Sequence, residues 1–243
     1  MYADDINEPF LHYKEDEAND IDDDKIRQSI RNGFISKVYG ILTFQIIITS
    51  IVVYFALISP SFQELLLKSA SMYYLSTFIS LFCLLLPLCS PKIYQKVPTN
   101  YIILTIFTLS YSWLVALVCC LYTFRSVMTA LFLTFVTVFS LSIYAMTTKK
   151  DFTVCGGTLF VCLILLIFSS LIFIIIPIPL SNLLFNYISL VLFSIYLIYD
   201  TQLLIGKGRV KYTEDDYILA AINIYLDVII LFLKILKIFG EKK

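Results

Sequence analysis

Long apolar runs separated by short polar breaks make up the chain from residue 37 onward. Each run holds about 18 or more residues, which is long enough to cross roughly 30 Å of hydrocarbon as an α-helix. The runs cover residues 37–58, 71–90, 100–122, 126–147, 153–176, 182–205 and 217–239. The pattern therefore predicts an all-α polytopic membrane protein, folded as a seven-helix transmembrane bundle.

Basic residues gather at alternate ends of these runs. They are Arg27, Arg31 and Lys37 before the first run, Lys92 and Lys96 after the second, Lys149 and Lys150 after the fourth, and Lys207, Arg209 and Lys211 after the sixth. Basic loops face the cytoplasm, so we expect a cytoplasmic amino terminus. A full seventh crossing would carry Lys242 and Lys243 to the opposite side, and six spans plus a re-entrant last segment is the alternative. The length of the last run favours a full span.

Composition separates an acidic beginning from the apolar remainder. Hydrophobic residues make up 59% of the 243-residue chain and charged residues 15%, with a formal net charge of zero. These values exclude an ordinary soluble domain and give no reason to expect a nucleic-acid partner. Ten of the eighteen acidic residues lie between Asp4 and Asp24. We expect residues 1–24 to form a disordered acidic cytoplasmic tail, and residues 25–243 to form the transmembrane domain, entered through a short amphipathic surface helix.

Two acidic residues lie inside the apolar runs, away from their ends. Asp200 ends the stretch "SIYLIYD", and Asp227 lies near the middle of the last run. A charge at such depth costs roughly 2.5–3.5 kcal/mol on insertion scales, and it marks a site facing the bundle interior. Asn223, Asp227 and Lys234 share one helical stripe, which we expect to face inward.

The two aspartates belong to an expected antiparallel helix pair. Counted from the loop between their runs, their depths differ by roughly 7 Å at 1.5 Å per residue, so a tilt or a broken helix would bring them together. Two neighbouring carboxylates in a site of low dielectric constant resist joint ionisation, and we expect them to share a proton. Two buried packing residues are the plainer alternative.

Catalytic chemistry has little support in this composition. The only histidine, His12, lies in the acidic tail, and the six cysteines lie within or at the edges of apolar runs. A Ser-His dyad or a histidine-ligated metal site in the bundle is excluded. A membrane aspartyl protease remains as a formal alternative. We expect the protein not to be an enzyme and to need no cofactor.

The carboxyl-terminal stretch "LIYDTQLLIGKGRVKYTEDDYILAAINIYLDVIILFLKILKIFG" resembles the signature of the transmembrane Bax inhibitor motif (lifeguard) family. "IRNGFISKVYGILTFQIIITS", "KVPTNYIILTIFTLS" and "VFSLSIYAMTTKKDFTVCGG" extend the resemblance, which is greatest to the Golgi anti-apoptotic protein branch. It implies a bundle with the last helix near the centre, and a pH-sensitive calcium leak in a Golgi or endoplasmic reticulum membrane that restrains apoptosis. Asp200 and Asp227 match the family's paired aspartates, which would sense pH and bind Ca²⁺ transiently.

Two positions depart from the family pattern. Some members carry an arginine before the third span that latches onto the first aspartate, whereas "PKIYQK" offers Tyr94, Lys92 and Lys96 in that region. Relatives in this branch also have an acid within the third span, where this chain has Tyr111. Ion throughput or selectivity would differ accordingly.

Three functions follow as hypotheses. The first is the calcium leak channel, whose partners are the lipid bilayer, calcium ions and protons. The second is a proton-coupled transporter, since the same two carboxylates could relay protons. The third is a non-conducting adaptor that binds survival-pathway membrane proteins through the acidic tail or a helix face.

Overall fold

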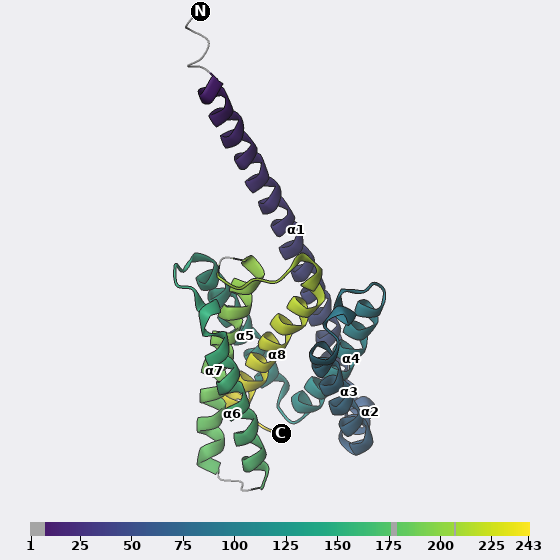
Figure 1. Cartoon of the computed structure of the whole chain (residues 1–243). Coiled ribbons are helices and arrows are strands. Elements are labelled where there is room, and N and C mark those ends of the chain that lie inside the picture. Colours follow the sequence, from purple (N-terminus) through teal and green to yellow (C-terminus); the bar gives the residue numbers. More distant parts are fainter. Residues whose placement is uncertain (1–7, 176–178, 207) are drawn as a thin grey trace, which may run out of the picture.

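Helices form nearly all of the computed structural model, which describes residues 8–175, 179–206 and 208–243. The α-helices are α1 (Glu8–Ile58), α2 (Pro60–Lys68), α3 (Ala70–Cys89), α4 (Thr99–Cys120), α5 (Phe124–Thr147), α6 (Gly156–Ile175), α7 (Pro179–Ile205) and α8 (Tyr217–Phe239) (Figure 1). The 3-10 turns are η1 (Pro91–Gln95), η2 (Phe152–Cys155) and η3 (Glu214–Asp216). All the α-helices of this described part except α2 are long and apolar enough to cross a membrane. The predicted seven-helix bundle is confirmed.

Helix α1 is longer than the first predicted span. It begins at Glu8 and continues without interruption to Ile58, and its first part projects away from the bundle (Figure 1). The expected surface helix is thus continuous with the first span. Residues 8–24 of the expected disordered tail are helical as well, while residues 1–7 lie outside the described residues. No proline or glycine stands between Phe10 and Asn32, so nothing in that stretch breaks the backbone hydrogen-bond ladder.

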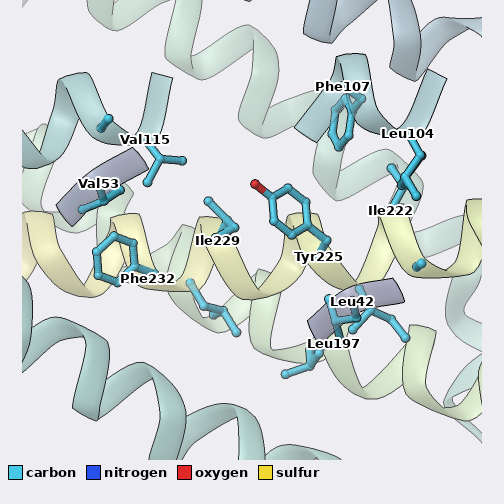
Figure 2. Packing of buried hydrophobic residues seen from close by; sticks show 14 of the residues in the cluster. Leu42, Val53, Leu104, Phe107, Val115, Leu197, Ile222, Tyr225, Ile229 and Phe232 are labelled. Carbon is cyan, nitrogen blue, oxygen red and sulfur yellow. The ribbon is translucent and has the colours of Figure 1, made fainter. Parts of the chain in front are cut away.

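Helix α8 lies at the centre of the bundle. Of its most apolar window 61% is buried inside the protein, against 44% for α7 and 11% for α3. It packs against α1, α4, α5 and α7. Figure 2 shows Tyr225, Ile229 and Phe232 of α8 directed toward residues of α1 and α4, among them Phe107 and Val115. The central last helix expected from the family resemblance is confirmed.

The carboxyl-terminal segment is bound to the loop between α4 and α5. The Thr123 N–H donates to the Glu241 carbonyl at 3.0 Å, and the Lys243 N–H donates to the Leu121 carbonyl at 3.0 Å. Ser126 Oγ accepts from the Glu241 N–H at 2.9 Å. Helix α8 therefore runs unbroken to the end of the bundle opposite its own start. This is a full span and not a re-entrant segment.

Candidate functional site

The structure brings Asp200 of α7 and Asp227 of α8 together in the bundle interior. Their side chains are only 6% and 4% exposed, and the two carboxyl groups are close enough to interact with each other. A hydrogen bond between two carboxyl groups requires a proton on one of them. A proton shared by the two groups would therefore remove one of their two negative charges.

Tyr212 closes one side of the carboxyl pair. Its hydroxyl donates to Asp200 Oδ1 at 3.3 Å and accepts from Asn223 Nδ2 at 2.8 Å. Burial, and then the nearby Asp200 carboxylate, raise the pKa of Tyr212 well above its ordinary value. The phenol therefore stays protonated at neutral pH and keeps its hydrogen for the carboxylate. Asp227 Oδ2 is buried with no hydrogen-bond partner among the described residues.

Arg31 of α1 holds the loop that carries Tyr212. Its Nη1 donates to the Tyr212 carbonyl at 2.8 Å, and its Nη2 donates to the Leu203 carbonyl in the last turn of α7 at 2.5 Å. A cation at this end of a helix also interacts favourably with the helix dipole. Gly206 has a φ of +74°, and a Cβ there would lie 3.0 Å from Arg31 Nε. Glycine thus meets both the left-handed backbone and the close guanidinium.

The predicted polar stripe of α8 divides between two environments. Asn223 and Asp227 both take part in the site around Tyr212 and Asp200. Lys234 is half-buried and turns toward α7, where its Nζ lies 4.7 Å from the centre of the Phe185 ring. Such a cation–π contact stabilises an ammonium group in apolar surroundings.

The candidate latch residues lie in and beside η1, between α3 and α4. Lys92 and Lys96 are exposed, and Tyr94 is buried and donates to the Cys83 carbonyl of α3 at 2.5 Å. No hydrogen bond or ion pair found in the described part of the chain joins any of these three to Asp200. Gln95 of the same turn donates to Asp216 Oδ1 at 3.0 Å. This turn therefore contacts η3 at the start of α8, not the aspartates.

Two carboxyl groups alone are too few ligands to fill the coordination shell of a calcium ion. Ca²⁺ takes roughly 6–8 oxygen ligands, and two carboxylates supply at most four. Across the described residues, no group of three or more His, Cys, Asp or Glu side chains could hold a metal ion. A calcium ion between Asp200 and Asp227 would therefore keep part of its water shell.

A second polar cluster lies across α8 from the carboxyl pair and joins α8 to α1 and α4. Thr49 Oγ1 is 2.7 Å from the Tyr225 hydroxyl and 2.9 Å from Ser112 Oγ. Gln45 Nε2 donates to Thr108 Oγ1 at 3.0 Å. All five side chains are buried. We call Gln45, Thr49, Thr108, Ser112 and Tyr225 the hydroxyl cluster.

The stretch of the chain that is similar to known proteins includes both the aspartate pair and the hydroxyl cluster. The family described as inhibitor of apoptosis-promoting Bax1 matches residues 31–243. The chain belongs to this Bax inhibitor family. A BI1-like protein of Arabidopsis thaliana is 38% identical over 217 residues, which cover 87% of this chain and 82% of the relative. Protein lifeguard 3 is 29% identical in Homo sapiens and 31% in Mus musculus, over 88% of this chain and 70% and 71% of the relatives. These relatives agree with the lifeguard assignment.

Sequence reasoning missed three buried or half-buried polar residues near the aspartate pair of this Bax inhibitor family protein. Arg31 and Tyr212 are described above. Gln202 is buried two residues after Asp200, where its Nε2 donates to the Lys150 carbonyl at 2.9 Å and its Oε1 accepts from the Phe152 N–H at 2.8 Å. Of the three, only Gln202 could have been found from the sequence, because it follows Asp200 in the polar run "YDTQ" within an apolar segment.

Proposed function

We propose that this Bax inhibitor family protein is a pH-sensitive calcium leak channel of an intracellular membrane, the Golgi or the endoplasmic reticulum, that lowers stored calcium and so restrains apoptosis. The observation that carries the proposal is the buried carboxyl pair between α7 and the central helix α8, where Asp200 and Asp227 are neighbours. Ionisable side chains at such depth mark ion or proton pathways in membrane proteins.

The closed state is the one in which the pair shares a proton. The proton binds Asp200 to Asp227, and the Tyr212 hydroxyl donates to Asp200. Arg31 keeps the Tyr212 loop over the end of α7. In this arrangement α7 and α8 are held together at the aspartates, and the path past the carboxyl pair is blocked by Tyr212.

Loss of the shared proton opens the path. Two negative charges at contact distance repel strongly where the dielectric constant is low, so α7 and α8 separate at the aspartates. The same charges attract a divalent cation through hard carboxylate oxygens. Because Tyr212 stays protonated over this range, the carboxyl pair is the group that responds. Calcium flux should therefore rise as the pH rises.

Calcium flux into liposomes that hold the purified protein tests the proposal between pH 5 and pH 8. Wild type should carry calcium with a rate that increases with pH, and Asp200→Asn and Asp227→Asn should each remove that dependence. Asp215→Asn is the matched control, because Asp215 is an exposed acid in η3. It should behave as wild type. A pH-dependent flux that survives in both aspartate variants would overturn the carboxyl gate.

Proton-coupled transport is the second candidate, favoured by the direct contact between the two carboxyl groups. It predicts that an imposed pH gradient drives calcium movement and that calcium movement shifts the internal pH of the liposome. A channel of the proposed kind changes its conductance with pH but needs no opposing proton flux. If wild type carries no calcium at all, the hypothesis that remains is a non-conducting adaptor that binds survival-pathway membrane proteins.

A further inference from the structure

An apolar groove of about 670 Å³ runs along the bundle between α1 and α5. Helix α1 lines it from Tyr39 to Leu57, and helix α5 lines it from Phe124 to Met146. At 1.5 Å per residue these stretches are about 27 Å and about 33 Å long. The hydrocarbon core is roughly 30 Å thick, so the helix stretches that line the groove are about as long as the core is thick.

The floor of the groove belongs to the central helix. Val228, Ile229 and Phe232 of α8 line it, and Ile229 and Phe232 are only 6% and 8% exposed. The rim, by contrast, carries exposed Tyr54 of α1 and Phe135 of α5. The groove is therefore continuous with the lipid-facing surface of the protein and leads inward from it to α8.

The lining suits hydrocarbon and not water. Its polar groups are a few hydroxyls, and two of them are already engaged: Thr49 in the hydroxyl cluster, and Thr134 with the Ala130 carbonyl. The volume falls within the roughly 300–1,000 Å³ that ligand pockets commonly have. An apolar cavity of this size within a bilayer offers an ordered place for a lipid tail.

Positive charge marks one end of the groove. Met146 lines it in the last turn of α5, and the exposed Lys149 and Lys150 follow directly after that helix. At the end of a transmembrane helix, lysine side chains reach the level of lipid headgroups and attract anionic ones.

We propose that the groove between α1 and α5 binds an anionic membrane phospholipid, with one acyl chain lying on the α8 floor and the headgroup at Lys149 and Lys150. The chain would pack against Val228, which directly follows Asp227. A bound lipid would thus contact the helix that carries the candidate site. This inference does not rest on calcium conduction, and its test measures no ion flux.

The test uses purified protein in liposomes that contain a trace of phosphatidylserine with a photoreactive diazirine near the end of one acyl chain. After illumination, mass spectrometry maps the crosslinked residues. Any lipid around the protein can label exposed side chains such as Phe132. Only a chain inside the groove can reach Ile229 and Phe232, so we expect label on this floor.

Two matched variants fill the groove without touching the buried core. Ser50→Phe and Ser142→Phe place a ring on the α1 wall and on the α5 wall, at serines that line the groove and are not buried. Both should remove the label from the floor and keep it on the lipid-facing surface. Ser140→Phe is the control, because Ser140 is an exposed serine of α5 outside the lining.

The headgroup is tested with the same probe on phosphatidylcholine. Phosphatidylserine should label the floor more strongly, and the double variant Lys149→Gln, Lys150→Gln should abolish that preference. An unlabelled floor, or a floor labelled equally in Ser50→Phe and Ser140→Phe, would overturn the acyl-chain site. Equal labelling by both probes in wild type would overturn the anionic headgroup, and floor labelling by a photoreactive sterol but not by either phospholipid would overturn the ligand class.

Discussion

The two sides of α8 carry polar groups of opposite character. Toward α7 it presents Asp227, one of the two buried carboxyl groups, with an oxygen that has no partner among the described residues. Toward α1 and α4 it presents Tyr225, only two residues earlier, whose hydroxyl bonds to Thr49. Hydroxyls keep the same charge at every physiological pH, whereas a carboxyl pair does not. One side of the helix is therefore suited to hold α8 in place, and the other to respond to protons.

Removing Arg31 should have the largest effect on stability. Arg31→Ala leaves the carbonyls of Leu203 and Tyr212 without their charged donor, so we expect a loss of about 1.5–3 kcal/mol in the free energy of unfolding. Unfolding in detergent micelles measures it. The released Tyr212 should also increase calcium flux at low pH. Arg27→Ala, one turn earlier at an exposed position, should change neither quantity, and an equal effect of both variants would refute the role of Arg31.

Breaking the hydroxyl cluster should cost stability without altering the response to pH. Thr49→Val keeps the shape of the side chain but removes the buried hydroxyl that bonds to Tyr225 and Ser112, which should lower the free energy of unfolding by about 1–3 kcal/mol. Thr43→Val is the control, since the exposed Thr43 donates to the Tyr39 carbonyl of its own helix. If Thr49→Val removed the pH dependence of flux, the division between the two sides of α8 would be wrong.

Removing only the phenolic oxygen should have a smaller effect. Tyr225→Phe keeps the ring, which lies 6.1 Å from Phe107 and 6.0 Å from Tyr111 between ring centres. It removes one hydrogen bond, while Thr49 keeps Ser112 as a partner. We expect a loss of about 0.5–1.5 kcal/mol, measured by the same unfolding experiment. A larger loss than in Thr49→Val would mean that the ring, not the hydroxyl, had been disturbed.

The smallest effect should come from Asp151, outside the bundle. Its carboxylate accepts from the Thr153 hydroxyl at 2.6 Å and from the Arg209 N–H at 3.2 Å, and so joins the loops at the ends of α5 and α7. The pKa of Asp151 lies below its usual value, first because of the Thr153 hydroxyl. The stabilisation is therefore present at neutral pH and disappears as the pH falls through that lowered pKa.

Thermal unfolding of Asp151→Asn beside wild type measures this contribution. The variant should melt slightly lower at pH 7, and the difference should shrink steadily below about pH 4, the ordinary pKa of an aspartate. Asp215→Asn provides the reference for an exposed acid. A difference that grew on acidification would contradict the sign of the Asp151 shift.

The spans and the burial of the two aspartates followed from the sequence because both depend on local patterns. Apolar runs of sufficient length fix the helices, and an acid within such a run must face inward. The hydroxyl cluster could have been found in the same way, since Gln45 and Thr49, and also Thr108 and Ser112, are spaced four residues apart on one helical face.

Other parts of the site depend on contacts that no local pattern encodes. From the sequence, Arg31 is one of several charges on an amphipathic surface helix. The carbonyls that it binds lie more than 170 residues away in the sequence, so no local pattern predicts them. From the sequence, Tyr212 is an ordinary loop residue. Its hydroxyl reaches Asp200 because the loop turns back at Gly206 over the end of α7. The expected depth difference between the aspartates assumed parallel helix axes, and the contact between them requires that α7 and α8 cross.

The continuity of α1 gives the two sides of the central helix a common mechanical connection. Arg31, which holds the Tyr212 loop, and Thr49, which bonds to Tyr225, stand on one unbroken helix, about 27 Å apart at 1.5 Å per residue. A rotation of α1 about its axis would displace both contacts at once. A protein or membrane surface that bound the projecting amino-terminal end of α1 would therefore transmit any rotation of this helix to the interior of the bundle.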